Sequence, residues 1–359
     1  MIPIAKPMIG DEEKKAVLAV LESGMIVQGQ KVKELEEKFA QYCGVKHAIA
    51  VSNGTAALHV ALKALNIGPG DEVITSPFTF VASANAILMA GATPVFADID
   101  EKTFNLSPAA VEKKITKKTK AILAVDLYGL PADYTALGAI AKKHQLKLIA
   151  DACQSVGAEL NGKKTGSLAD ITAFSLYATK NIMCGEGGMI TTNDDAAADF
   201  AKKFRHHGQH QQYSYEFLGY NYRMTDIAAA IALCQLQRIG KITEQRRKNA
   251  AQLTASLNGI VRIPFIPPAS THAFHQYTII TEQRDSLRNY LKTKEIDSRI
   301  FYPKPLHLEP HFAYLGCKRG DFPIAEKACE TVLSLPVHPL VTEKELKYIA
   351  EKVREFHGM

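Results

Sequence analysis

Several signatures of common protein classes are absent from this chain of 359 residues. None of the six cysteines forms a C-x-x-C pair, and no cysteine–histidine cluster has zinc-finger spacing. No apolar run approaches the roughly 20 residues that a membrane-spanning helix needs. Neither G-x-G-x-x-G nor G-K-[ST] occurs, so nothing favours a dinucleotide-binding fold or a P-loop. We expect no metal site, no membrane segment, and free thiols in a reducing compartment.

The distribution of charge excludes another class of partner. The formal net charge is +6, from 43 Lys and Arg against 37 Asp and Glu. These charges are spread along the chain and do not form the dense basic stripe of a nucleic-acid-binding protein. We therefore expect no nucleic-acid partner, although a mild positive excess suits an anionic small substrate. Charged residues follow the first six residues closely, unlike in a signal peptide, so the expected location is the cytoplasm.

An alternating pattern is present instead. Two helices are expected first, at 11–23 and about 31–42, and strand-like apolar runs then alternate with helix-like segments. The runs are 47–51, 72–75, 93–97, 121–125 and 147–150, and the helical segments are about 55–66, 79–90, 107–115 and 133–145. This alternation predicts an α/β fold with a large, mostly parallel sheet and helices on both faces. Ligands of such sheets bind beyond the carboxyl ends of the strands.

The pattern changes after about residue 240. One long helix is expected from 225 to about 253, followed by shorter elements. A last helix is expected to start at Thr342, which has Glu345 three residues on, as in a capping box. We interpret residues 1–240 as a large domain with N-terminal helices and 241–359 as a smaller α+β domain.

The segment Ser175–Gly188 (SLYATKNIMCGEGG) is the most informative one. Lys180 stands between an apolar run and a glycine cluster, and Asp151 ends an earlier apolar run. A pyridoxal phosphate (PLP) enzyme needs such a pair: the lysine forms a Schiff base with the aldehyde, and the carboxylate keeps the pyridine nitrogen protonated. The alternatives are a surface loop lysine and a turn carboxylate.

Other strand ends carry polar or aromatic residues. Gly54 and Thr55 lie between a strand and a helix, where free helix amides favour a phosphate. Phe80 offers an aromatic face that can stack on a planar ring. Gln154, three residues after Asp151, is placed to donate to the phenolic oxygen of that ring. An ordinary polar cap, a core phenylalanine and a turn are the respective alternatives.

The segment 218–226 (LGYNYRMTD) mixes the polar residues Asn221 and Arg223 with apolar and aromatic neighbours ahead of a predicted helix. A mixed segment of this kind suits a buried interface, and a bare helix N-terminus is the alternative.

Taken together, these segments resemble the DegT/StrS family of nucleotide-sugar aminotransferases over nearly the whole chain. The stretches GDEVIT, GATPV and YPKPLH also match, in the same order. The resemblance implies the aspartate aminotransferase-like fold of PLP-dependent transferases and a homodimer with active sites at the subunit interface. It assigns Ser175 to the cofactor phosphate and Phe80 to ring stacking. It also implies that Asn221 reaches the phosphate in the neighbouring subunit's site.

Comparison within the family refines the prediction. Sugar dehydratase relatives have histidine at the lysine position, so Lys180 favours transamination. Members commonly carry small hydroxyl residues where this chain has Met183 and Cys184, a departure beside the lysine. Tyr222 favours amination at sugar C4, because members acting at C3 often have serine there. Candidate contacts to the sugar, with packing in the small domain as the alternative, are Tyr302 and His307.

We therefore expect a PLP-dependent aminotransferase that converts a nucleotide-linked keto-sugar, a 4-keto-6-deoxyhexose, with glutamate as amino donor. Two alternatives stay open. A keto-cyclitol aminotransferase would use the same site without a nucleotide, and a non-catalytic sensor or regulator would keep only the fold. Asp151, Gln154 and Lys180 together argue against the regulator, since a protein that only binds does not need all three.

Overall fold

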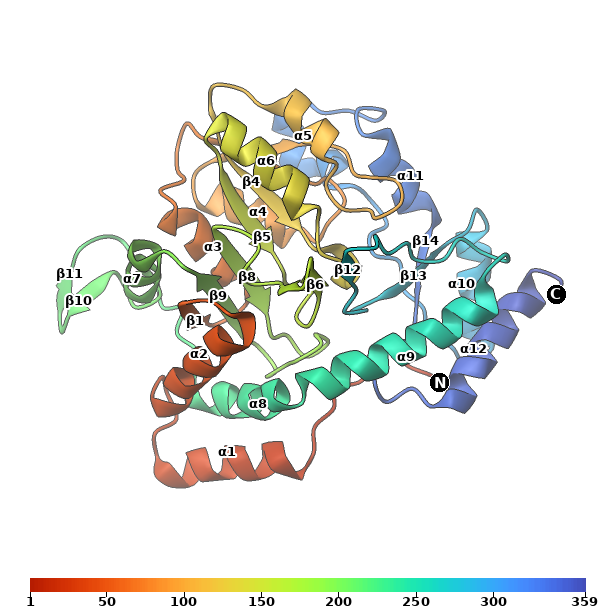
Figure 1. The fold of residues 1–359 in the computed structure, drawn as a ribbon, viewed down its shortest axis with the longest axis horizontal. Helices are drawn as coiled ribbons and strands as arrows, with labels where there is room; N and C mark the ends of the chain where they lie inside the picture. The colour runs from red at the N-terminus through yellow and green to blue at the C-terminus, as the bar shows by residue number, and fades with distance from the viewer.

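The computed structural model describes residues 1–359 and is built around one seven-stranded sheet (Figure 1). Its strands, in spatial order, are β1 (His47–Val51), β9 (Gly188–Thr192), β8 (Ile171–Ser175), β5 (Lys147–Asp151), β4 (Thr119–Val125), β2 (Glu72–Thr75) and β3 (Thr93–Phe96). Neighbours from β8 to β3 run parallel, and only β9 runs antiparallel to the strands beside it. The mostly parallel sheet confirms the predicted α/β class.

Helices cover both faces of the sheet because its strands are apolar on both sides. Along β4, Leu123 and Val125 join one core cluster while Ile122 and Ala124 join another, as the two-residue repeat of a strand requires. The helices of the first face are α3 (Gly54–Ala64), α4 (Ala82–Met89) and α7 (Asp195–Phe204). Those of the second are α2 (Gln30–Cys43), α5 (Pro108–Lys114), α6 (Tyr134–His144) and α8 (Asp226–Gln237).

The predicted helix 225–253 is wrong as a single element. The structure has α8 and then α9 (Ile239–Leu257), which meet at Arg238. Arg238 pairs there with the buried Glu13 of α1 (Asp11–Ser23). The break has a packing reason: α8 lies against α1 and α2, whereas the later part of α9 lies against α12 (Glu343–Phe356).

Asp226 ties the start of α8 to the start of α2. Its buried carboxylate accepts hydrogen bonds from the backbone amides of Gly29, Lys31 and Val32 at 2.8, 3.0 and 3.0 Å. These amides belong to a helix start and have no helical partner, so a carboxylate from a distant segment serves as their cap. The segment that ends in Asp226 is thereby held against the large sheet.

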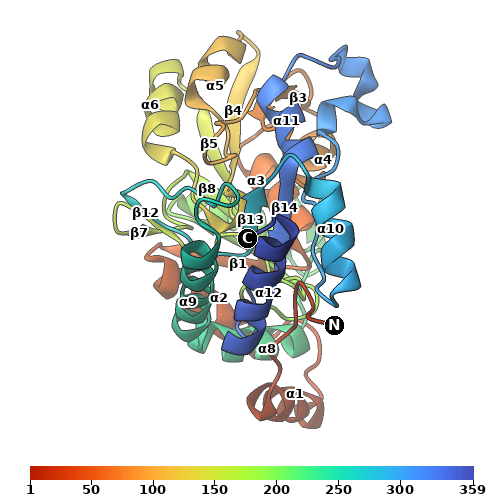
Figure 2. The same cartoon turned by 90° about the vertical axis from the view of Figure 1, so that its right-hand side faces the viewer.

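The C-terminal residues form a second core. Strands β13 (Tyr277–Ile280) and β14 (Val332–Leu335) pair antiparallel and pack with α9, α10 (Arg284–Thr293) and α12 (Figure 2). The predicted capping box of α12 is present, with Thr342 and Glu345 bonded reciprocally. However, Leu306, Phe312 and Phe322 pack into the core of the large sheet. The division into 1–240 and 241–359 therefore stays a prediction.

The remaining elements are short. They are β6 (Glu159–Leu160), β7 (Lys163–Lys164) and β12 (Ser270–Thr271) in one small sheet, the hairpin β10 (Gln209–Gln211) with β11 (Ser214–Tyr215), α11 (Pro323–Thr331), and the 3-10 turns η1 (Leu127–Gly129), η2 (Leu306–Leu308) and η3 (Pro310–Leu315). The hairpin projects from the body of the molecule beside α7 (Figure 1). None of the helices combines the length and apolarity needed to cross a membrane.

Candidate active site

A cavity of about 860 Å³ lies beyond the carboxyl ends of the parallel strands, where ligands of such sheets bind. Its walls come from the strand ends, the N-terminus of α3 and segments near residues 275 and 302. Most of the residues singled out in the sequence line it, namely Gly54, Thr55, Phe80, Asp151, Gln154, Ser175, Lys180, Tyr222 and Tyr302.

Lys180 is held in the loop between β8 and β9. Its backbone amide donates to the carbonyl of Tyr177 at 2.8 Å, and the side chain of Asn181 donates to the carbonyl of Ala273 at 2.9 Å. Burial lowers the pKa of Lys180 below its usual value, and Cys153 and Asp151 nearby oppose this only in part. A lowered pKa raises the fraction of neutral amine, which is the form that attacks a carbonyl.

Asp151, at the end of β5, is a buried carboxylate that forms no salt bridge within 4 Å. Its Oδ2 accepts a hydrogen bond from Ser83 Oγ at 2.7 Å, and its Oδ1 accepts one from the amide of Cys153 at 3.2 Å. Thr79 lies 3.0 Å from the Ser83 hydroxyl and supports it. A buried carboxylate is stable as an anion only with a partner, and a protonated pyridine nitrogen in the cavity would be one.

Gln154 has its amide orientation fixed by the backbone. Its Oε1 accepts from the amide of Tyr128 at 2.8 Å, so its Nε2 is left to donate into the cavity. That Nε2 lies 3.4 Å from the hydroxyl of Tyr302. Gln154 thus offers a donor on the cavity wall, and its contact with a ring oxygen stays a prediction.

The start of α3 forms a cradle for an anion. Asn53 caps the helix, because its side-chain oxygen accepts from the amide of Ala56 at 2.8 Å. The earlier amides of Gly54 and Thr55 have no helical partner. A Cβ at Gly54 would lie 2.9 Å from the Cβ of Ser175, so only glycine lets the helix begin this close to the serine hydroxyl. These groups fit a phosphate.

Two aromatic rings stand over the cavity. The side chain of Phe80 is 56% exposed, although the residue lies next to a buried strand end, and its ring centroid is 6.2 Å from that of Tyr302. An exposed phenylalanine inside a cavity is available to stack on a planar ring. The residues present therefore fit PLP at its phosphate, at its pyridine nitrogen, at its phenolic oxygen and at its aldehyde.

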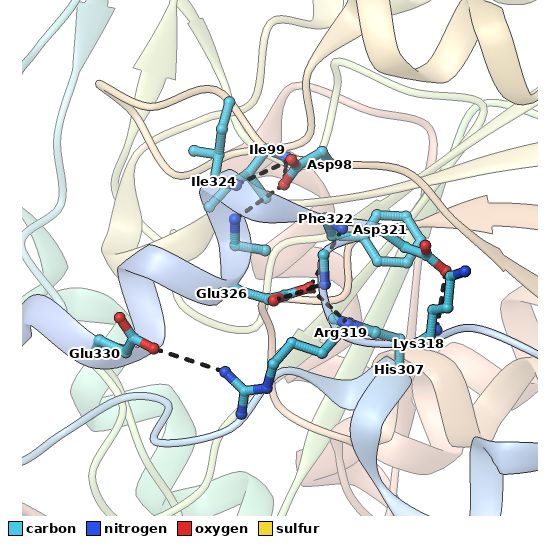
Figure 3. A network of polar contacts seen from close by, with 12 residues as sticks. Asp98, Ile99, His307, Lys318, Arg319, Asp321, Phe322, Ile324, Glu326 and Glu330 are labelled. Atoms are coloured by element: carbon cyan, nitrogen blue, oxygen red, sulfur yellow. Dashed lines mark hydrogen bonds and ion pairs between the residues drawn. The ribbon is translucent and has the colours of Figure 1, made fainter.

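The structure places His307 away from the cavity. Its side chain is buried between η2 and α11, with Nε2 3.2 Å from Glu326 Oε1 and its ring against Phe322 (Figure 3). Glu326 also accepts from the amide of Gly320, and Asp98 caps the start of α11 in the same network. His307 thus takes the packing role that the sequence left as its alternative.

Asn221 does not line the cavity of this chain either. It is exposed and pairs with His206 at the base of the projecting β10–β11 hairpin. Met183 and Cys184, which depart from the family pattern, are buried, and Cys184 packs in the core beneath the sheet.

Several residues that line the cavity were not predicted from the sequence. Ile4, Glu186, Arg246 and His275 all contribute to its walls. They come from the N-terminus, the loop before β9, α9 and the segment before β13. Glu186 lies within the segment Ser175–Gly188 but was not singled out, and the other three stand outside the motifs described above. Only the three-dimensional packing brings them to the strand ends.

Comparison with known proteins gives consistent matches along the chain. The model of the DegT/DnrJ/EryC1/StrS aminotransferase family matches residues 7–354. The chain is 46% identical to the "Pleiotropic regulatory protein" of Geobacillus stearothermophilus, with 94% of this chain and 92% of that one covered. It is 39% identical to a UDP-N-acetyl-3-dehydro-alpha-D-glucosamine 3-aminotransferase of Acidithiobacillus ferrooxidans, over 97% and 95%. It is 42% identical to the GDP-perosamine synthase of Caulobacter vibrioides, over 96% and 95%.

Solved structures also match this chain over nearly its whole length. S. venezuelae DesV in complex with a ketimine intermediate superposes with a TM-score of 0.95 and 37% identity, covering 97% of this chain and 95% of that one. The PLP form of a putative sugar aminotransferase from Streptococcus pneumoniae gives a TM-score of 0.95 at 29% identity, covering 99% and 98%. This likeness confirms the predicted fold of PLP-dependent transferases.

Proposed function

Because the chain belongs to the DegT/DnrJ/EryC1/StrS aminotransferase family, and is thus a PLP-dependent transaminase, we propose that it aminates a nucleotide-linked keto-sugar. The proposed acceptor is a 4-keto-6-deoxyhexose, and the proposed donor is glutamate. One observation carries this proposal: a buried carboxylate without a cation, Asp151, shares a cavity with Lys180 and a phosphate cradle.

The residues have distinct roles in this reaction. PLP supplies an electron sink when it is bound. Asp151 holds a proton on the pyridine nitrogen, and Gln154 donates from Nε2 to the phenolic oxygen. Gly54 and Ser175 hold the phosphate. The amine of Lys180 would hold the cofactor and, once free, would move the proton at the reacting carbon as a general acid and base.

Sugar nucleotides are supported as substrates by two relatives, whose names specify UDP-linked and GDP-linked compounds. Tyr222 lines the cavity and its hydroxyl lies 3.2 Å from Nδ1 of His59, so its position is fixed. The proposed amination at C4 rests on this tyrosine. The 3-aminotransferase relative has a name that specifies C3 chemistry, so the position of the amine needs a direct test.

A regulatory role is the second candidate. It is favoured by the relative from Geobacillus stearothermophilus, which is named a pleiotropic regulatory protein and is 46% identical to this chain. A regulator would need the ligand cavity but not a lysine with a lowered pKa beside a carboxylate that lacks a cation. Measuring whether the protein turns over an amino donor and a keto-sugar distinguishes the enzyme from the regulator.

The first prediction concerns the acceptor. With glutamate present, we expect a 4-keto-6-deoxyhexose nucleotide to be converted to a 4-amino sugar, with the new amine located at C4 by NMR. The visible absorbance of the bound cofactor should fall when glutamate is added alone and return when the keto-sugar follows, because the two half-reactions alternate.

The matched comparison is a 3-keto nucleotide sugar under the same conditions. Amination only at C3 would refute the regiochemistry and leave the sugar-nucleotide class intact. Conversion of a free keto-cyclitol, with every nucleotide sugar refused, would favour the cyclitol alternative. Absorbance that glutamate does not change would favour the regulator.

We also propose a homodimer with shared active sites. The β10–β11 hairpin and the segment after it leave large apolar side chains in solvent, with Tyr213 80% and Leu218 78% exposed. Asn221 follows three residues after Leu218, at the base of the hairpin, where it pairs with His206. A contact between subunits would cover these side chains and place Asn221 beside the partner's phosphate cradle.

The second prediction tests this arrangement by complementation. Lys180→Ala and Asn221→Ala should each lose activity as homodimers. Mixed dimers should regain up to about a quarter to a half of the wild-type rate, because one of the two sites then contains both native residues. Activity is measured after the two variants are unfolded and refolded together. A fully active monomer in sedimentation, or mixtures that stay inactive, would refute the shared site.

A further inference from the structure

Arg246 is a buried cation that has no acidic partner. It lies on α9 with only 5% of its surface exposed. Its Nη1 donates to the carbonyls of Phe274 at 3.0 Å and His275 at 3.4 Å, and its Nε has no acceptor. Burial alone lowers the pKa of Arg246 to about 10, with no carboxylate acting against it. A buried guanidinium with unused donors is unfavourable unless a ligand completes its bonding.

The backbone places this side chain close to Lys180. Asn181, the residue after the lysine, donates to the carbonyl of Ala273 at 2.9 Å, and Arg246 donates to the next carbonyl, that of Phe274. Two consecutive carbonyls therefore hold the lysine loop and the arginine. Arg246 and Lys180 also share the wall of the main cavity and that of a small adjoining hollow of about 20 Å³.

The segment that carries these carbonyls is fixed from its other side as well. The amide of Ala273 donates to the carbonyl of Gly129 at 2.8 Å, and the amide of Gln276 donates to that of Tyr128 at 3.1 Å. Tyr128 is the residue that orients Gln154. The arginine, the lysine and the groups that face the cofactor ring thus belong to one bonded unit, so Arg246 is preorganised.

Among the charged residues of the cavity, Arg246 is not needed to bind the cofactor. The lysine and arginine side chains in its walls are Lys180 and Arg246, and the acidic ones are Asp151 and Glu186. In the proposed function, Lys180 would attach the cofactor and Asp151 would hold the proton on its ring nitrogen. His275 lies nearby. Its burial, together with the charges of Lys180 and Arg246, keeps its pKa well below the usual value, and its Nδ1 has no hydrogen-bond partner. Arg246 is the cation that remains for an anionic substrate.

We propose that Arg246 binds the α-carboxylate of the amino-acid donor, with Nδ1 of His275 as a second polar contact. The inference rests on the proposed function for the identity of the donor. A planar guanidinium matches a carboxylate through two parallel hydrogen bonds.

The position of Arg246 selects this carboxylate over the diphosphate of the acceptor. In an amino acid, the α-carboxylate sits on the same carbon as the reacting amine. An amine placed at Lys180 therefore brings its carboxylate beside Arg246. In a nucleotide sugar that reacts at C4, the diphosphate on C1 lies across the sugar ring, so it must point away from the lysine.

The third prediction uses glutarate as the probe, because it has the two carboxylates of glutamate and no amine. Isothermal titration calorimetry on the holoenzyme gives its dissociation constant for wild type, Arg246→Gln and Arg247→Gln. Arg247 is the matched control: it donates to the carbonyls of His272 and Gly157, both at 3.0 Å, and does not line the cavity. Arg246→Gln should weaken glutarate binding by about 10- to 100-fold, as expected for a charged hydrogen-bonded pair.

Two further measurements guard against misfolding of that variant. Arg246→Lys keeps the charge but loses the planar fork, so it should retain part of the affinity. Thermal unfolding with cofactor bound reports whether each variant is folded. In the wild type, the α-amide of glutamate should have a KM at least about tenfold above that of glutamate, because the amide lacks the negative charge that Arg246 binds.

Each failure has its own signature. Equal glutarate affinity in wild type and Arg246→Gln would overturn the carboxylate site and leave the donor standing. If Arg246→Gln weakened the binding of free UDP and left the affinity for glutarate unchanged, Arg246 would belong to the acceptor site. That result would also overturn the carboxylate site. A wild-type enzyme that neither binds glutarate nor reacts with glutamate would overturn the proposed donor itself.

Discussion

Lys180→Ala is expected to reduce transamination to an undetectable rate while the protein stays folded. No other lysine lines the main cavity, so no second amine can attach the cofactor or move the proton at the reacting carbon. The phosphate cradle at Gly54 and Ser175 and the carboxylate of Asp151 are unchanged in this variant. The cofactor should therefore still bind, without a covalent bond and without the visible absorbance of the wild type.

Borohydride reduction of the wild type, followed by peptide mapping, identifies the attached residue directly. The label should appear on the peptide that contains Lys180. Lys6 is the matched control, because it lines the small hollow that adjoins Lys180. Lys6→Ala should keep both the label and the turnover. A label on Lys6, or full activity in Lys180→Ala, would refute the assignment.

Local sequence patterns predicted most of the large sheet. The strands His47–Val51 and Glu72–Thr75 have the predicted bounds, because short apolar runs between turns are strongly favoured as buried strands. The strand Gly188–Thr192 was not predicted. It follows a glycine cluster, lacks a periodic pattern, and pairs with β8, the strand before it, and with β1, which lies far away in the sequence. The break at Arg238 has a similar origin, since only packing against α1 and α12 requires it.

The residues of the candidate site also divide into those that local sequence predicted and those that only the packing of the fold brings into place. The residues proposed to hold the cofactor, such as Lys180, Asp151 and Gln154, stand in short motifs at or just after strand ends, and the parallel sheet brings these ends to one edge. Arg246 lies in an ordinary amphipathic helix, and its place in the cavity depends on hydrogen bonds to residues 274 and 275. His307 stands in a motif but faces Glu326, because the backbone turns at η2. A motif thus predicts a residue type more reliably than the direction of its side chain.

Asp151→Asn is expected to reduce turnover by several orders of magnitude without unfolding the protein. Asparagine keeps the shape of the side chain, and its oxygen can still accept from Ser83 or from the amide of Cys153. It cannot hold a proton on the pyridine nitrogen, because it carries no charge. Without that proton the ring withdraws electrons poorly, and electron withdrawal is the main contribution of the cofactor.

A direct measurement of the ring nitrogen separates this role from a structural one. With cofactor labelled with ¹⁵N, the nitrogen signal should indicate a protonated ring in the wild type and a neutral ring in Asp151→Asn. Asp126→Asn is the matched control. Asp126 is a fully buried carboxylate at the end of the neighbouring strand β4, bonded to Ser155 and Tyr134, and it does not line the cavity. Its replacement should lower the midpoint of thermal unfolding and leave the ¹⁵N signal in place. If Asp151→Asn kept both near-normal turnover and a protonated ring, Asp151 would be only a turn residue, and the proton would have to be held by another group.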